Sequence, residues 1–138
     1  MTKINILILL SAIIFISCDC NGDSDCNNVA CTEEFVMITV NIVDGNQNPI
    51  ILDDFKVVDI DNNIDLTDDL KDYYQSYLND GTYPIFDDRF QQDYQNQEIE
   101  LQFIGYIEDQ EVINEYYLVG ADCCHVYPIS GNYYIIIE

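Results

Sequence analysis

Four residues that could bind a metal or support nucleophilic chemistry stand together late in the chain: Asp122, Cys123, Cys124 and His125. Carboxylate, thiolate and imidazole groups are zinc and copper ligands, and a thiol beside a histidine is a potential nucleophile pair. Consecutive side chains of a strand point to opposite faces, so they do not converge on one ion or on each other. We therefore expect disulfide chemistry here. Zinc or copper binding, or an enzyme that uses this segment, is the alternative.

The cysteines fall into two groups that are far apart in the sequence. Cys18, Cys20, Cys26 and Cys31 lie near the N-terminus, and Cys123 and Cys124 lie near the C-terminus. Cysteines of exported proteins pair by default, and an odd number leaves one unpaired. If Cys18 is modified, the simplest framework ties Cys26 and Cys31 to the later pair and leaves Cys20 free. The partner of each cysteine stays open at this point.

An acidic run gives a second candidate site, this time for a cation. Asp59, Asp61, Asn63 and Asp65 place oxygen atoms at alternate positions, as in a calcium-binding loop. The run lacks the glycine and the bidentate glutamate of such a loop, so it is better explained as a polar turn. Calcium is therefore the cofactor that this run leaves open. With 26 acidic residues, some carboxylate pair meets the spacing of a glycosidase by chance, so we assign no catalytic residue and expect a protein that is not an enzyme.

Residues 1–17 have the pattern of a bacterial export signal: a basic start at Lys3, then an apolar run from Ile6 to Ile16. The run is too short to span a bilayer as a helix. The residues Phe15-Ile16-Ser17-Cys18 resemble the lipobox of bacterial lipoproteins. That resemblance implies lipidation of Cys18, which becomes the new N-terminus, and a membrane anchor of acyl chains such as palmitate. An ordinary cleaved signal and an uncleaved anchor helix are the alternatives.

Residues 18–34 are polar, acidic and rich in turn-forming residues, as expected of a tether. In surface lipoproteins of some Gram-negative bacteria, acidic residues after the lipidated cysteine direct export to the outside. The segment from Asp19 to Asp25 resembles a loose version of that signal. The resemblance implies an exported protein anchored by lipid to a bacterial membrane, at the outer membrane or the cell surface.

The overall composition excludes one class of partner and predicts one folded domain. The chain has 138 residues and a formal net charge of −22, with 4 basic residues against 26 acidic ones. Nucleic-acid binding depends on neutralising phosphates with Lys and Arg, so DNA and RNA are excluded as partners. An apolar content of 49% predicts a packed core, and the length predicts a single domain after the tether, over residues 35–138.

Alternation with a period of two predicts strands through most of this domain. Val36, Ile38, Val40 and Ile42 share one face of the segment 35–43, and a similar alternation covers 99–107. Further strands are expected at 55–60, 112–119, 124–129 and 133–137. Ser130-Gly131-Asn132 is expected to join the last two as a hairpin.

One segment has the period of a helix. Leu70, Tyr73, Tyr74, Tyr77 and Leu78 form a single stripe, which predicts a helix near 68–79 whose tyrosines lie against a sheet. Thr67 is a suitable capping residue for this helix. Tyrosine pairs also recur in the expected strands, where one ring of each pair should face outward.

These patterns predict a mainly β fold: a single antiparallel β-sandwich of six or seven strands with one short inserted helix. The stretch from Val40 to Ile50, with its Asp44-Gly45 turn and Pro49, resembles the opening of transthyretin-like and carboxypeptidase-regulatory-like modules. That family is built as small β-sandwiches that support attachment and perform no catalysis. We therefore expect a non-catalytic, membrane-anchored binding, accessory or structural module, with a protein or peptide as its possible ligand.

Overall fold

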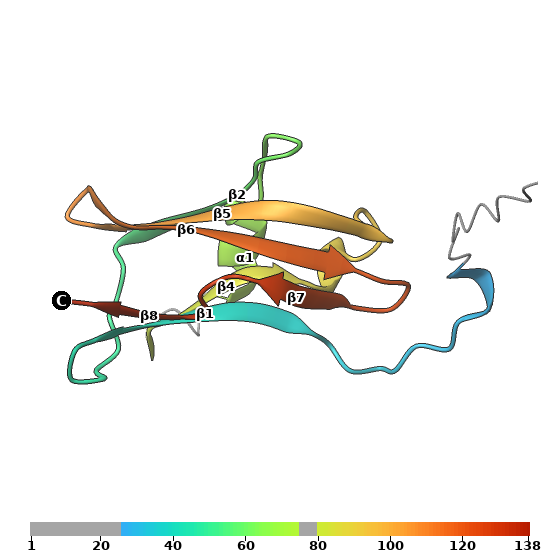
Figure 1. The fold of residues 1–138 in the computed structure, drawn as a ribbon, viewed down its shortest axis with the longest axis horizontal. Helices are drawn as coiled ribbons and strands as arrows, with labels where there is room; N and C mark the ends of the chain where they lie inside the picture. Colours follow the sequence, from blue (N-terminus) through green and yellow to red (C-terminus); the bar gives the residue numbers. More distant parts are fainter. Residues whose placement is uncertain (1–25, 75–79) are drawn as a thin grey trace, which may run out of the picture.

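A computed structural model describes residues 26–74 and 80–138, and two sheets packed face to face form the body of this part of the chain (Figure 1). The prediction of a mainly β sandwich with one short helix is confirmed, although the described residues form eight strands where six or seven were expected. The elements are η1 (Cys26–Asn28), β1 (Met37–Asp44), β2 (Asp54–Asp59), β3 (Ile64–Asp65), α1 (Thr67–Tyr74), β4 (Thr82–Asp87), η3 (Asp88–Phe90), β5 (Gln97–Ile107), β6 (Gln110–Ala121), β7 (Val126–Ser130) and β8 (Tyr134–Ile137).

The smaller sheet has the strand order β4-β1-β8, and the larger one has the order β3-β2-β5-β6-β7. Every strand pair is antiparallel except β1 with β8, which is parallel. The antiparallel prediction therefore holds for the larger sheet and fails for β8. The parallel pair places the C-terminus at the same end as the β5–β6 turn, opposite the N-terminal segment (Figure 1).

The hairpin predicted at Ser130-Gly131-Asn132 is wrong, because this link carries the chain from one sheet to the other. Gly131 has a φ of 142° and passes over the ring of Tyr117, and a Cβ placed there would lie 2.3 Å from that ring. Tyr117 is fully buried, and its hydroxyl donates to the carbonyl oxygen of Asn132 at 2.7 Å. The crossing therefore depends on a glycine with no side chain.

The predicted alternation accounts for the core. Ile38, Val40 and Ile42 of β1 are buried, and so are Ile99, Leu101 and Phe103 of β5. Apolar side chains that alternate along a strand face one side of the sheet, so these two sets line the inner faces of the two layers. Aromatic rings fill the space between the layers, with centroids of Phe55 and Phe103 5.8 Å apart and those of Phe55 and Tyr83 5.6 Å apart.

Strand β4 was not predicted. Its residues Tyr83 to Asp87 are all buried, so the sequence shows no alternation there, and Pro84 argues against a strand. Pro84 is accommodated opposite Thr39, beside a register shift in the pairing of β1 with β4. Its neighbours Ile85 and Phe86 are fully buried in the core.

The helix α1 lies where the stripe predicts a helix, but the prediction that its tyrosines lie against a sheet is wrong for Tyr73. Leu70 and Tyr74 are buried, while Tyr73 is 57% exposed, and the predicted positions Tyr77 and Leu78 lie outside the described residues. Thr67 is the first residue of the helix. Its hydroxyl accepts a hydrogen bond from the backbone N–H of Val57 at 3.0 Å, so it joins α1 to β2 instead of capping the helix.

The neighbouring tyrosines divide between the core and the surface, as expected for the pairs in strands but not for Tyr73 and Tyr74 of α1. Tyr74 is buried beside exposed Tyr73, and Tyr117 is buried beside Tyr116, which is half exposed. Tyr134 is also exposed, whereas its neighbour Tyr133 packs against the core and lies 5.1 Å from Tyr117 between ring centroids. The tyrosine excess is therefore largely a packing feature.

Candidate functional site

The segment from Asp122 to His125 forms a tight turn between β6 and β7. The side-chain oxygen Oδ1 of Asp122 accepts hydrogen bonds from the N–H groups of Cys124 at 2.7 Å and His125 at 2.8 Å. The N–H of Asp122 in turn donates to the carbonyl oxygen of His125 at 2.9 Å. The donated hydrogen bonds hold the pKa of Asp122 below its ordinary value, because they stabilise the ionised form.

The expectation that a strand begins at Cys124 is wrong, since β7 begins at Val126. Cys123 and Cys124 follow the end of β6 in a bend, where side chains do not alternate between opposite faces. Both sulfur atoms can therefore reach the same neighbouring segment. The expectation that consecutive side chains of this segment point to opposite faces applies only to a pleated strand.

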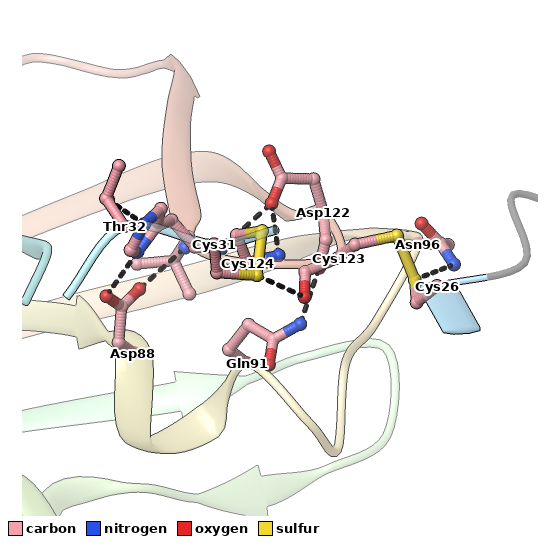
Figure 2. Close-up of a disulfide and its surroundings, with 11 residues drawn as sticks. Cys26, Cys31, Thr32, Asp88, Gln91, Asn96, Asp122, Cys123 and Cys124 are labelled. Carbon is pink, nitrogen blue, oxygen red and sulfur yellow. Dashed lines mark hydrogen bonds and ion pairs between the residues drawn. A yellow bond between two sulfur atoms is a disulfide. The ribbon is translucent and has the colours of Figure 1, made fainter. Parts of the chain in front are cut away.

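Two disulfides join this turn to the N-terminal segment, Cys26 to Cys123 and Cys31 to Cys124 (Figure 2). The Cα atoms are 5.3 Å apart in each bridge, and the sequence separations are 97 and 93 residues. The predicted framework of two bridges is present in the structure, with a definite pairing. A cystine sulfur is neither a thiolate ligand nor a nucleophile, so zinc, copper or catalytic use of these cysteines would require the reduced protein.

His125 connects the same turn to two other segments. Its Nδ1 atom lies 2.8 Å from Oδ2 of Asp88, at the start of η3, and its Nε2 atom lies 2.8 Å from Oγ1 of Thr32, on the N-terminal segment. Asp88 also accepts hydrogen bonds from the N–H groups of Val36 at 2.7 Å and Val126 at 2.8 Å. One carboxylate thus joins the N-terminal segment, η3 and the start of β7. Figure 2 shows Asp88 and Thr32 on the same side of the turn as the Cys31 to Cys124 bridge.

A carboxylate, an imidazole and a hydroxyl in this order also occur in serine-type hydrolases. Such an enzyme needs N–H donors for the oxyanion that forms during the reaction. The N–H groups of Cys124 and His125 donate to Asp122 and that of Val126 donates to Asp88, so these three do not serve as such donors. The contacts of Thr32, His125 and Asp88 attach the N-terminal segment to the turn.

The segment between η3 and β5 supports the turn from its other side. The buried side chain of Gln91 donates to the carbonyl oxygen of Asp122 at 2.6 Å. The backbone N–H of Asn96 donates to the carbonyl oxygen of Ala121 at 2.7 Å. Figure 2 shows Gln91 and Asn96 beside Asp122 and Cys123. We call the two bridges, His125, Asp88 and these contacts the N-terminal clamp.

The two carboxylates Asp87 and Asp88 are adjacent but serve different partners. Asp87 is fully buried and binds the Arg89 guanidinium, with a shortest distance of 2.8 Å, and the hydroxyl of Tyr74 at 2.9 Å. The bonds to Asp87 raise the pKa of Arg89, and burial together with the Asp87 bond raises the pKa of Tyr74. The guanidinium carbon also lies 4.4 Å from the ring centroid of Tyr73. This cluster secures α1 to the end of β4.

The calcium candidates are used by the turns in which they lie. Asp59 is fully buried and accepts hydrogen bonds from Asn62 and Tyr94, while Asp61 accepts from the N–H of Glu100 at 3.2 Å. Asp65 accepts from the N–H of Thr67, and Asn63 has a positive φ of 55°. Within residues 26–74 and 80–138, no three His, Cys, Asp or Glu residues are grouped as a metal site.

The residues Thr32 and Asp88 were missed by the sequence analysis. Their only signal was chemical type, since 93 and 37 positions separate them from His125. The lipidation candidate Cys18, the expected free Cys20 and the export signal all lie outside the described residues.

Comparisons of this chain with protein-family models, curated proteins and solved structures found no match. In the part that the structure describes, no helix is both long enough and apolar enough to cross a membrane.

Proposed function

We propose that the chain is an exported lipoprotein, anchored to a bacterial membrane through Cys18, whose sandwich acts as a non-catalytic binding or accessory module. The observation that carries the proposal is the pair of disulfides between the N-terminal segment and the β6–β7 turn. Disulfides persist in oxidising compartments outside the cytoplasm, which supports export. The lipobox resemblance at residues 15–18 supports the lipid anchor.

The position of the clamp supports a role for the anchor in orientation. Cys26 follows the lipidation candidate by only eight positions, and the clamp fixes it to one end of the sandwich. The β1–β2 turn, the β5–β6 turn and the C-terminus lie toward the opposite end (Figure 1). A lipid at Cys18 would therefore hold the clamp end near the membrane. The other end would face away from it, at the outer membrane or the cell surface.

Metabolic labelling with a palmitate analogue tests the anchor directly. Wild-type protein should incorporate the label, Cys18→Ser should abolish incorporation, and Cys20→Ser should retain it as the matched control. Labelling that persists in Cys18→Ser, or wild-type protein without label, would remove the lipoprotein proposal.

The alternative, a zinc or copper protein or an enzyme that uses Cys123, Cys124 and His125, makes a different prediction. Purified wild-type protein should contain no zinc or copper and one titratable thiol, at Cys20. Bound metal together with reduced Cys123 and Cys124 would favour the alternative, since both of these cysteines are bridged under the present proposal.

A further inference from the structure

A cavity of about 440 Å³ lies between the start of α1, the turn before β3 and the segment that precedes β5. Three of its lining residues, Leu66, Phe90 and Tyr94, are buried members of the core. Ligand sites in proteins have volumes of roughly 300–1,000 Å³ and combine apolar walls with a few polar groups. The cavity thus offers an apolar wall to the body of a small ligand.

The charged groups of the lining all have one sign. Asp69 and Asp93 contribute exposed carboxylates, and no Lys, Arg or His lines the cavity. The three ion pairs found within residues 26–74 and 80–138 involve the carboxylates of Asp54, Asp87 and Asp88. Neither lining carboxylate is in one of these ion pairs, although the Arg89 guanidinium, which pairs with Asp87, also donates to the backbone carbonyl oxygen of Asp69 at 2.9 Å.

Each uncharged polar side chain uses one hydrogen-bond donor within the protein. The side-chain amide of Asn62 donates to Asp59 at 2.8 Å, that of Gln97 is directed at the carbonyl oxygen of Asp93 at 3.5 Å, and the hydroxyl of Tyr94 donates to Asp59 at 2.9 Å. The carbonyl oxygens of both amides and the lone pairs of the tyrosine hydroxyl remain available as acceptors, and each amide also keeps one further N–H. An occupant that carries hydrogen-bond donors can use these acceptors.

Asp59 adds a negative charge behind this wall. It is fully buried, and it accepts hydrogen bonds from the N–H and the side-chain amide of Asn62 and from Tyr94 while it donates none. These hydrogen bonds use both of its carboxyl oxygens. None of the three ion pairs includes it, and charge acts over a longer range in the weakly polarisable interior than in water. Both residues that donate these hydrogen bonds to Asp59, Asn62 and Tyr94, line the cavity.

We propose that this cavity binds an organic cation, with an ammonium or guanidinium group between Asp69 and Asp93 and an apolar part against Leu66, Phe90 and Tyr94. A free amine and the Lys or Arg side chain of a partner protein share this chemistry. The described residues form no metal-ligand group of three, and a bare metal ion would make no use of the apolar wall. The proposal deepens the binding role proposed above and rests on it for its biological meaning, but its test does not depend on the lipid.

Isothermal titration calorimetry on the full-length protein in detergent micelles at low ionic strength provides the test. Benzylamine and agmatine represent free amines, and acetyl-Ala-Lys-Ala-amide represents a protein side chain. Benzyl alcohol and the peptide with norleucine in place of lysine are the neutral counterparts. Binding of a cationic probe should exceed that of its neutral counterpart and should weaken as salt is added. The arm that binds, amine or peptide, then identifies the source of the cation.

Matched double variants locate the binding. Asp69→Asn with Asp93→Asn should weaken binding about tenfold, at roughly threefold for each exposed carboxylate. Asp68→Asn with Asp72→Asn makes the same change in the net charge of the protein. Both of these residues are exposed on α1 and lie outside the cavity lining, so this variant should weaken binding less than about twofold. Thermal melts establish that both variants are folded.

Three results would overturn the proposal. The neutral counterparts could bind as well as the cations, or the two double variants could lose affinity equally. Finally, the amines and the peptide could give no binding heat while calcium chloride gives one, and the Asp69 and Asp93 double variant could lose that calcium heat. Each result is independent of palmitate labelling, so failure here would leave the lipoprotein proposal intact.

Discussion

The imidazole of His125 and the carboxylate of Asp88 meet at 2.8 Å, and this contact connects the disulfide-bonded turn to the end of β4. Asp88 is only 12% exposed, and its two oxygen atoms also hold the N–H groups of Val36 and Val126. The backbone N–H of Asp88 donates a hydrogen bond to the carbonyl oxygen of Val36 at 3.1 Å. The N-terminal segment is therefore attached by hydrogen bonds as well as by sulfur.

Asp88→Ala should lower the free energy of unfolding by about 2 to 4 kcal/mol, because it leaves two N–H groups that are mostly shielded from water without an acceptor. Urea denaturation of the oxidised protein measures the change. Thr32→Val is the matched control, since Thr32 is exposed and bonds only through its hydroxyl to His125, and it should cost less than about 1 kcal/mol. If the two variants were equally stable, Asp88 would not be the centre of the clamp.

Removal of the second disulfide should destabilise the domain more than removal of the first, whichever bridge is removed first. While Cys31 to Cys124 is intact, the other bridge closes a loop of only roughly eight residues and contributes about 2 to 3 kcal/mol in the chain-entropy model. Loss of both bridges also opens the long loop and should cost about 7 kcal/mol. Paired Cys→Ser variants of one bridge, the other and both would measure this. Additive losses, in which the double variant loses only the sum of the two single losses, would contradict this overlapping arrangement.

Asp122 should make the clamp sensitive to acid. Its pKa is lowered in the folded protein, so its contribution to stability is present above its ordinary pKa and is lost as the pH falls toward the lowered value. Unfolding free energies measured between pH 6 and about pH 3 should fall less steeply in Asp122→Asn, which keeps the acceptor oxygen and removes the titration. An identical pH dependence in the wild type and in this variant would show that Asp122 does not contribute.

The crossing at Gly131 should tolerate no side chain. Gly131→Ala places a methyl group 2.3 Å from the fully buried ring of Tyr117 and requires a residue at a φ of 142°, so we expect a loss of about 2 to 4 kcal/mol. Gly120→Ala is the matched control. Its methyl group meets the ring of Tyr127, which is 39% exposed and can rotate away, so the loss should stay below about 1.5 kcal/mol. A reversed order of the two losses would contradict the crossing described here.

Local patterns in the sequence predicted the strands that have one buried face and one exposed face. The alternation in β1 and β5 predicted their buried faces, and the cysteine spacing predicted two bridges to the N-terminal segment. β4 was missed because its residues are buried on both faces, so no alternation remains to be read. The parallel pairing of β8 depends on the crossing at Gly131, where a turn-forming sequence is compatible with both a hairpin and a change of sheet.

Only the two disulfides of the clamp could be predicted from the sequence. Two cysteines in an exported chain limit each other's choice of partner, whereas a lone histidine gives no indication of which of 26 acidic residues it meets. The contact of His125 with Asp88 exists because η3 follows β4 directly and β7 begins next to it, which is a property of the fold. The cavity beside α1 has the same origin, since Asp69 and Asp93 come from separate segments.

Mass spectrometry of the N-terminal peptide, prepared from membranes by digestion at acidic residues, tests the central claim that this clamped sandwich is an anchored, exported module. We predict a peptide that begins at Cys18 and carries a diacylglyceryl group on its sulfur. A peptide that begins at Met1, or an unmodified peptide with another new N-terminus, would contradict it.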